Sequence, residues 1–181
     1  MNEMLQDLYR ITGEYNSKRI LRCIKYDLGF RFMYFWRKAK STGGLRKKIY
    51  CKLLWNLEKK TGIEIPLSAN IGGGLQMIHP HNITVNSKAT IGKNCVLLKG
   101  CTIGNVKSGK HLGAPVIGND FYCGLNSTVV GGIKIGDDVL VAANTYVNFD
   151  VPSHSIVIGS PGVIHHKDYA TKEYISNRIE E

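Results

Sequence analysis

Aliphatic or similarly small apolar residues recur at every sixth position through the second half of the chain. They fall into three registers: Ile65, Ile71 and Met77; Val85, Ile91, Leu97 and Ile103; and Ile117, Cys123, Val129, Ile135, Val141 and Val147. A six-residue unit is too short for a helical hairpin, but it suits a short strand and a turn whose apolar side chain stacks on its neighbours. A flat sheet would show a period of two. The pattern therefore predicts a mainly β protein, with a parallel β-helix over residues 63–164.

The register slips by two residues at two places, between Met77 and Val85 and again between Ile103 and Ile117. The first break contains the sequence His-Pro-His at residues 79–81. The second contains the polar stretch 105–114, which we expect to form a loop that leaves the coil. Because irregular segments of repeat proteins often lie on the binding face, both breaks are candidate functional sites.

The first 62 residues have helical rather than hexapeptide spacing. Apolar residues four apart, with basic residues between them, predict an amphipathic helix: Leu45, Ile49, Leu53 and Leu57. A similar stripe predicts a preceding helix, with a turn at residues 41–44: Ile20, Leu21, Ile24, Leu28, Phe32 and Phe35. We therefore expect a basic, aromatic-rich helical region at 1–62, the β-helix, and a C-terminal tail at 165–181 that forms a short helix.

Charge is concentrated in that helical region. The net charge is +10, and residues 1–62 hold 15 Lys or Arg against 5 Asp or Glu. Basic helices with aromatic residues suit an anionic membrane surface, so peripheral contact through residues 18–60 is one interpretation. Packing against the chain's own β-helix or a partner subunit is the other. No nucleic-acid-binding motif accompanies the charge, and we expect no nucleic acid partner.

The five cysteines are odd in number and include no Cys-x-x-Cys pair, so we expect reduced thiols and no structural zinc site. The longest apolar stretches are far shorter than a transmembrane helix, and the N-terminal residues do not resemble a secretory signal. These features predict a cytoplasmic location, either free or at the inner face of the membrane.

Several motifs occur in a fixed order. They are Ile78-His79, ATIGKNC at 89–95, CTIG at 101–104, PVIGND at 115–120, VPSHS at 151–155 and GSP at 159–161. Together they resemble the hexapeptide-repeat acyltransferases, in particular the serine acetyltransferase branch and its shorter relatives that O-acetylate capsular or exopolysaccharide sugars. The resemblance implies a left-handed β-helix, a homotrimer with active sites between subunits, and acetyl-CoA as acyl donor without a metal.

The resemblance assigns the catalytic general base to His79. An alcohol is a poor nucleophile at neutral pH until a base with a pKa near the working pH takes its proton, and imidazole meets this need. Glu64 matches an aspartate that orients the histidine in serine acetyltransferases, although Glu is one methylene longer. The histidines His81 and His111 are candidate substrate contacts.

The sequence departs from the serine acetyltransferase pattern where that family recognises serine. Ile78 replaces an aspartate, and residues 113–114 (Gly-Ala) replace an Arg-His pair. These differences favour a sugar hydroxyl, in a polysaccharide or in a lipid-linked or nucleotide-linked precursor, as the acceptor. For acetyl-CoA, the resemblance points to four positions: Asn105, Leu125, Ala143 and Lys167.

Three alternatives remain at this stage. One is serine O-acetylation in cysteine biosynthesis, and another is a trimeric β-helix scaffold without catalytic activity. A third is a zinc site of the gamma-type carbonic anhydrases built from His79, His81 and His111. The His-Pro-His stretch lacks the ligand spacing of those enzymes, so we expect no metal.

Overall fold

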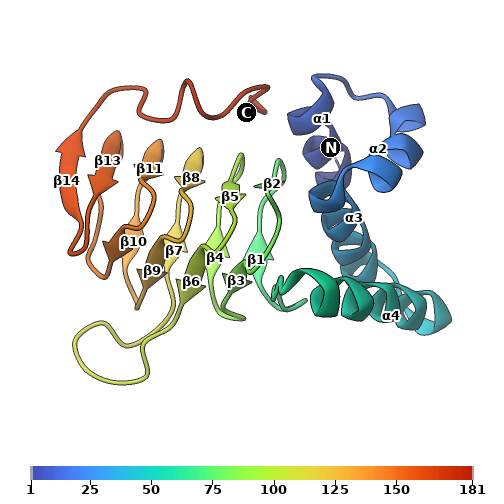
Figure 1. Cartoon of the computed structure of the whole chain (residues 1–181), viewed down its shortest axis with the longest axis horizontal. Coiled ribbons are helices and arrows are strands. Elements are labelled where there is room, and N and C mark those ends of the chain that lie inside the picture. Colours follow the sequence, from blue (N-terminus) through green and yellow to red (C-terminus); the bar gives the residue numbers. More distant parts are fainter. Residues whose placement is uncertain (1, 181) are drawn as a thin grey trace.

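The computed structural model describes residues 2–180 and consists of a helical region followed by a β-helix (Figure 1). The helices are α1 (Glu3–Thr12), α2 (Ile20–Tyr26), α3 (Leu28–Ser41) and α4 (Gly44–Thr61), with a 3-10 turn at Ser17–Arg19. The helix predicted from Ile20 to Phe35 is thus divided into α2 and α3. Asp27 divides them because its backbone is extended and its side chain accepts a hydrogen bond from the Phe30 amide, 2.8 Å away. The spacing of apolar residues did not predict α1.

Helix α3 closes the first end of the β-helix. Its aromatic residues Phe30, Phe32 and Trp36 are buried. The indole Nε1 of Trp36 donates to the carbonyl of Ile65 at 3.0 Å, just before the first coil. At Gly29 the helix approaches so closely that a Cβ atom would lie 2.7 Å from the Met77 carbonyl oxygen. The aromatic cluster therefore covers apolar surface that the first coil would otherwise expose.

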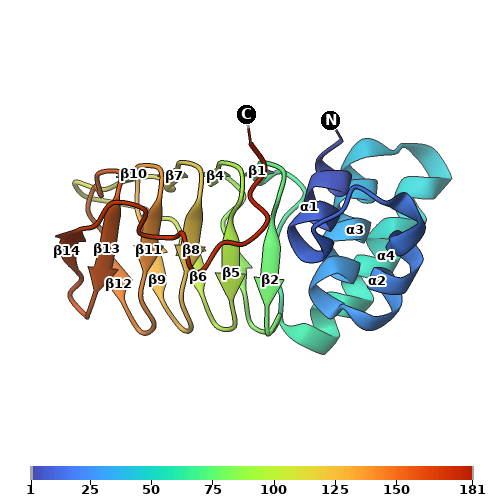
Figure 2. The same ribbon diagram turned by 90° about the horizontal axis from the view of Figure 1, so that it is seen from above.

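The β-helix consists of short strands that form three parallel sheets (Figures 1 and 2). The first sheet contains β1 (Asn70–Ile71), β4 (Thr90–Ile91), β7 (Val116–Ile117) and β10 (Lys134–Ile135). The second contains β2 (Gln76–Ile78), β5 (Val96–Leu98), β8 (Phe121–Cys123), β11 (Val139–Val141), β13 (Ser155–Ile158) and, antiparallel at its edge, β14 (Val163–His166). The third contains β3 (Thr84–Val85), β6 (Thr102–Gly104), β9 (Thr128–Val130) and β12 (Tyr146–Val147).

The six-residue period predicted the core correctly, because all thirteen positions are buried. Strand register stacks twelve of them in three columns, one for each sheet: Ile71, Ile91, Ile117 and Ile135; Met77, Leu97, Cys123 and Val141; and Val85, Ile103, Val129 and Val147. Each apolar side chain thus removes its neighbours in the adjacent coils from water. The architecture is a mainly β parallel solenoid, as the sequence predicted.

Close stacking of the coils explains the glycines that follow the aliphatic positions. A Cβ atom at Gly92 would lie 2.6 Å from the Gly118 carbonyl oxygen, and one at Gly118 would lie 2.9 Å from the Gly136 carbonyl oxygen. Both distances are shorter than real Cβ contacts, so a larger residue would force adjacent coils apart.

The segment after β6 leaves the solenoid as the sequence predicted and is visible as the long loop in Figure 1. The backbones of Val106 and Gly113 close its base with two hydrogen bonds of 2.9 and 3.0 Å. The loop is therefore an excursion with a defined root, and the coil resumes at β7.

The C-terminal segment corrects the sequence-based prediction of a helix. Residues 167–180 form turns and irregular chain that runs back along the second sheet towards α1 (Figures 1 and 2). Asn94 fixes its end, because its side chain donates to the Ile179 carbonyl at 3.1 Å and accepts from the Ile179 amide at 2.9 Å. A segment held by partners far away in the sequence needs no helical hydrogen bonds of its own.

Candidate active site

The first register break forms the corner between β2 and β3. His79 lies there with an exposed side chain and a left-handed backbone, φ 51°. Its carbonyl accepts a hydrogen bond from the His81 amide at 2.8 Å, and Asn82 also has a left-handed backbone, φ 52°. The tight turn orients His79 outward, where its imidazole is accessible to a substrate.

The end of α4 supports this corner. The Asn82 amide donates to the Thr61 carbonyl at 2.8 Å. The hydroxyl of Thr61 in turn donates to the Leu57 carbonyl at 2.7 Å and accepts from the Ile63 amide at 3.2 Å. The helical region therefore fixes the backbone next to His79 as well as closing the solenoid.

Glu64 lies on the third sheet beside β3. Its amide donates to the Ile83 carbonyl at 2.8 Å, and its carbonyl accepts from the Val85 amide at 2.9 Å, while its side chain is exposed. In the described part of the chain, the Glu64 carboxylate makes no hydrogen bond to the His79 ring. The orienting contact from Glu64 to His79 therefore stays a prediction for the substrate-bound state, in which such hydrogen bonds commonly tighten.

A second carboxylate near Glu64 was missed by the sequence analysis. Burial, and after it the negative charge of Glu64, raises the pKa of the Glu58 carboxyl. Glu58 lies in the last turn of α4, where its carbonyl accepts from the Gly62 amide. Helical spacing alone did not show which side of α4 faces the coil, so the sequence did not indicate that Glu58 lies near Glu64.

The His79 corner continues as a column along the solenoid. The amide of Gly100 donates to the His81 carbonyl at 3.0 Å, that of Asn126 to Lys99 at 3.0 Å, and that of Asn144 to Leu125 at 2.8 Å. These bonds place two predicted cofactor positions, Leu125 and Ala143, at the corner that begins with His79 and His81. The same bonds place Lys99, an exposed cation that was not predicted as a site residue, between His81 and Leu125 in this column.

The other predicted site residues lie elsewhere on the single chain. Asn105 is at the next corner, across the third sheet, where its side chain accepts from the Asn86 amide group at 3.0 Å. His111 is in the loop, and its carbonyl accepts from the Gly132 amide at 2.9 Å. Lys167 follows β14, and its amide donates to the His154 carbonyl at 2.8 Å. One chain therefore does not assemble all the predicted residues into a single site.

Two cysteine side chains fill the interior of the solenoid. Cys95 and Cys123 are fully buried, and Cys123 belongs to one of the stacked core columns. Burial raises the pKa of Cys95 well above its ordinary value, which disfavours the reactive thiolate. Across residues 2–180, no three His, Cys, Asp or Glu side chains are grouped so that they could hold a metal ion.

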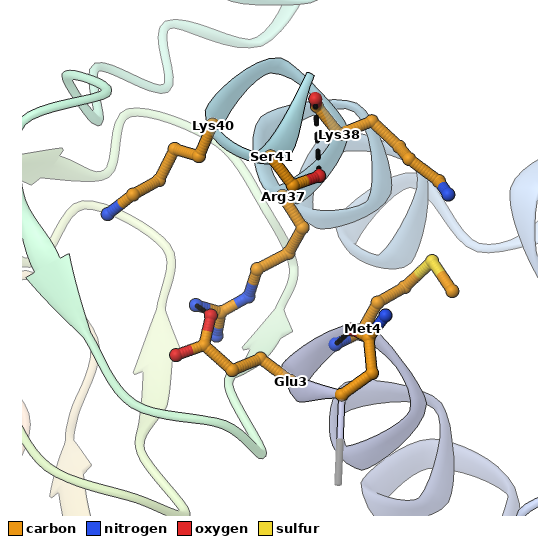
Figure 3. A pocket seen from close by; sticks show the side chains of 7 residues that line it. Glu3, Met4, Arg37, Lys38, Lys40 and Ser41 are labelled. Atoms are coloured by element: carbon orange, nitrogen blue, oxygen red, sulfur yellow. Dashed lines mark hydrogen bonds and ion pairs between the residues drawn. The ribbon is translucent and has the colours of Figure 1, made fainter.

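A pocket of about 220 Å³ lies between α1 and the end of α3 (Figure 3), and none of the predicted site residues lines it. Its principal cations are already engaged. Arg37 pairs with Glu3 at 2.9 Å, and the ammonium group of Lys40 donates to the Ala69 carbonyl at 2.7 Å. We therefore regard this pocket as part of the junction between the helices and the first coil.

The stacked aliphatic columns and the looped-out segment define a hexapeptide-repeat β-helix. No family model matches the sequence. The serine acetyltransferase of Synechococcus elongatus is 31% identical over 150 residues, which are 81% of this chain and 59% of that protein. Serine acetyltransferase 2 of Arabidopsis thaliana is 36% identical over 118 residues, 64% of this chain and 36% of that protein. The chain thus spans less than two thirds of the length of these relatives.

Solved structures agree with these sequence similarities. The Neisseria gonorrhoeae serine acetyltransferase in complex with serine is 26% identical with a TM-score of 0.70, and the match covers 90% of this chain and 66% of that one. Soybean serine acetyltransferase is 25% identical with the same TM-score and the same coverage. Together with the repeats, these likenesses show the hexapeptide-repeat β-helix fold of the serine acetyltransferases. The similar proteins are serine acetyltransferases, so the comparisons do not support the predicted relationship to the polysaccharide O-acetyltransferases.

Proposed function

We propose that the chain is an acetyl-CoA-dependent O-acetyltransferase with His79 as its general base. The observation that carries the proposal is the position of His79, exposed at the first corner of the column that also holds Leu125 and Ala143. In a chain similar to serine acetyltransferases, this column suits an extended acyl donor beside a base.

The reaction needs one base and one set of hydrogen-bond donors. The imidazole of His79 takes the proton of the acceptor hydroxyl while the hydroxyl oxygen attacks the thioester carbonyl of acetyl-CoA. The resulting tetrahedral oxyanion is stabilised by backbone N–H donors. When the C–S bond breaks, the imidazolium returns the proton to the CoA thiolate, and the products are an O-acetyl ester and CoA.

Serine is the acceptor that the comparisons favour, because the similar proteins are named serine acetyltransferases and one of the structures contains serine. On this proposal the chain forms O-acetylserine. The comparisons therefore support the alternative from the sequence analysis better than the sugar acceptor preferred there.

A sugar hydroxyl remains a second candidate because of two specific features. Ile78, where the family resemblance expects an aspartate, is half-buried and packs on an apolar cluster that contains Ile175 from the C-terminal segment. Gly113 stands where that resemblance expects a cation, and its backbone N–H and C=O groups are hydrogen-bonded to Val106. Neither position offers the charge that would recognise an amino acid's ammonium or carboxylate group.

A homotrimer belongs to the same proposal. The side chain of His79 is exposed on the single chain, whereas Asn105 and Lys167 lie away from its corner and His111 lies in the loop. A neighbouring subunit would bring such residues to the open side of His79. Measurement of the native mass in solution tests this directly, and a monomer would contradict it.

The deciding experiment measures CoA thiol release from acetyl-CoA with free serine and with a panel of sugars and sugar nucleotides. His79→Ala should lower kcat by at least about 100-fold, the usual contribution of a general base. His165→Ala, which removes an exposed histidine on β14, is the matched control and should retain activity. Retained activity in His79→Ala would refute the assignment.

The acceptor panel separates the candidates. Turnover with serine alone supports the first acceptor, and turnover with a sugar alone supports the second. Acetyl-CoA binding without turnover of any acceptor would instead favour the non-catalytic scaffold.

A further inference from the structure

Helix α4 has an apolar stripe that the rest of the chain leaves uncovered. Leu45, Ile49 and Leu53 follow one another at four-residue intervals and are 73%, 51% and 36% exposed. Leu54 and Leu57, on another side of the helix, are buried. The spacing of the sequence correctly predicted a helix here, but three of the four residues in the predicted stripe face away from the core.

Basic residues surround this stripe. Helix α4 carries one acidic residue, Glu58, and six basic residues: Arg46, Lys47, Lys48, Lys52, Lys59 and Lys60. Trp55 is 44% exposed, and the ammonium groups of Lys52 and Lys59 lie 4.0 and 3.6 Å from its ring centre. An exposed tryptophan beside lysines and leucines is the composition of a helix that lies in a membrane interface.

The charge distribution argues against a second copy of the chain as the partner. If two α4 stripes met symmetrically, the cations beside one stripe would face the cations beside the other. The remainder of the chain has no acidic excess to offer, since residues 63–181 contain nine basic and nine acidic residues. The surface that complements α4 must be apolar at its centre and anionic around it.

We propose that α4 binds the surface of a bilayer that contains anionic lipids, with Leu45, Ile49 and Leu53 inserted among the headgroups and the surrounding cations on the phosphates. The contact is peripheral, because none of the helices within residues 2–180 has the length and hydropathy needed to cross a bilayer. The proposal goes beyond acetyl transfer and does not depend on the identity of the acceptor.

The fluorescence of Trp55 provides a direct test. The chain contains two tryptophans, and Trp36 is already buried with its indole hydrogen-bonded to Ile65. A blue shift of emission on addition of vesicles would therefore come from Trp55. We expect the shift with phosphatidylcholine vesicles that contain about a quarter phosphatidylglycerol, a weaker effect at high salt, and none with pure phosphatidylcholine.

Variants of the full-length protein separate the apolar and ionic contributions in vesicle sedimentation. Leu45→Ser combined with Ile49→Ser leaves the charge unchanged and should weaken binding about tenfold or more. Lys48→Gln combined with Lys52→Gln should weaken it by a similar factor. Lys107→Gln combined with Lys110→Gln removes the same charge from the exposed loop and serves as the matched control, with binding retained.

Three results would overturn the proposal. The first is an absence of binding to anionic vesicles by the wild-type protein. The second is an equal loss of binding in the loop control, which would reduce the interaction to net charge. The third is a smaller native mass of the Leu45→Ser, Ile49→Ser variant in the absence of lipid, which would identify another copy of the chain as the partner of α4.

Discussion

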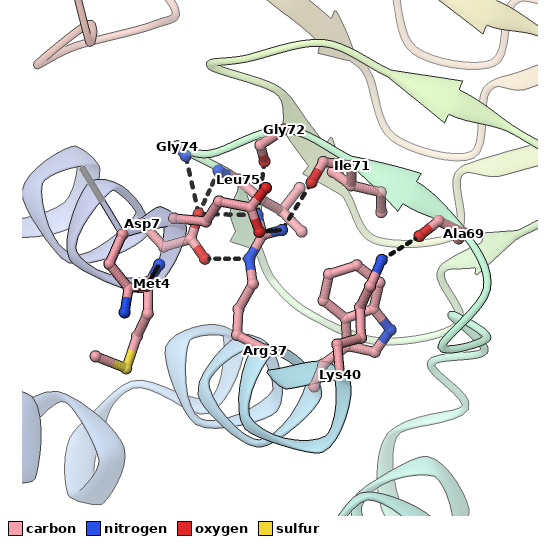
Figure 4. Close-up of polar contacts among 12 residues, drawn as sticks. Met4, Asp7, Arg37, Lys40, Ala69, Ile71, Gly72, Gly74 and Leu75 are labelled. Carbon is pink, nitrogen blue, oxygen red and sulfur yellow. Dashed lines mark hydrogen bonds and ion pairs between the residues drawn. The ribbon is translucent and has the colours of Figure 1, made fainter. Parts of the chain in front are cut away.

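Arg37 and Asp7 form a buried ion pair that joins α3 to α1, with Nε and Oδ2 2.9 Å apart and side chains only 5% and 1% exposed. Oδ1 of Asp7 also accepts hydrogen bonds of 2.9 Å from the amides of Gly74 and Leu75 in the first coil (Figure 4). Arg37 donates to the Ile71 carbonyl at 2.7 Å. These hydrogen bonds tie α1, α3 and the first coil together, so the helices and the β-helix share one polar junction.

We predict that Asp7→Asn destabilises the whole protein. The substitution leaves the buried Arg37 without its principal counter-ion, and loss of one partner of a buried pair typically costs about 3–5 kcal/mol. Equilibrium unfolding in urea measures this cost. Because the junction connects the two parts of the chain, the circular dichroism signals of the helices and of the β-helix should disappear in one transition in the wild-type protein.

An exposed ion pair is the control for this prediction. Arg19 and Glu14 are 3.0 Å apart, but their side chains are 45% and 50% exposed. Glu14→Gln should change the free energy of unfolding by less than about 1 kcal/mol. If the two variants were equally stable, the buried junction would not be the contact that joins the two parts.

The parts of the fold that repeat were predictable, and the parts that depend on distant pairing were not. A residue such as Ile91 stacks on the residue one coil away, so the spacing of the sequence contains the whole pattern. By contrast, the partner of Asn94 is Ile179, and that of Asp7 is Arg37. No local period indicates such pairs, which is why α1 and the course of the C-terminal segment were missed.

The candidate site divides in the same way. Leu125 and Ala143 share a corner because they are equivalent positions in adjacent coils, a relationship that the repeat period already implies. Lys167 lies beyond the last repeat, and its position beside His154 is fixed by the fold of β14. Spacing could not show whether Lys167 reaches the His79 corner, since residues outside a repeat have no register.

The loop after β6 rests on the turn that contains Gly132. The Gly132 amide donates to the His111 carbonyl at 2.9 Å, and a Cβ atom at Gly132 would collide with the Leu112 carbonyl oxygen. We predict that Gly132→Ala releases the loop, so that trypsin cleaves at Lys107 and Lys110 several times faster while the urea midpoint changes little.

Gly43→Ala is the matched control, because a Cβ atom there meets nothing within 4 Å and the backbone is not left-handed. Cleavage of the loop should be unchanged in this variant. Equal cleavage rates in the Gly132→Ala protein and the wild type would mean that the loop is held in some other way.

Glu64 offers a prediction about catalysis. If its carboxylate orients His79 in the substrate complex, Glu64→Gln removes a hydrogen bond to a charged group, about 1.5–3 kcal/mol, and lowers kcat by about 10- to 150-fold. Steady-state assays with acetyl-CoA and the acceptor that is turned over measure this loss.

Glu58→Gln removes a carboxylate from the neighbouring turn of α4 and serves as the comparison. It should leave kcat unchanged. The opposite result, with Glu58→Gln impaired and Glu64→Gln normal, would transfer the orienting role to Glu58.

Asp138 controls the attachment of the C-terminal segment and makes it sensitive to acid. Its Oδ1 accepts hydrogen bonds from the amide and the hydroxyl of Thr171, at 2.9 and 2.7 Å, and its Oδ2 accepts from the Ala170 amide and contacts His154 Nδ1, both at 2.9 Å. Burial alone would raise the pKa of this carboxyl. The hydrogen bonds outweigh burial and hold the pKa below its ordinary value of 3.8.

The sign of the pH dependence follows from that depressed pKa. The carboxylate contributes stability that is fully present above pH 3.8 and is lost as the pH falls through the lower pKa of the folded state. We therefore predict that amide hydrogen-exchange protection at Ala170 and Thr171 is constant from pH 7 to about pH 4 and falls below that. In Asp138→Asn, protection should be at least about tenfold weaker at every pH, since a neutral amide cannot replace these charge-assisted bonds. Asp168→Asn removes an exposed carboxylate from the same segment and should leave the profile unchanged, whereas an acid-induced loss that persists in Asp138→Asn would assign the sensitivity to another group.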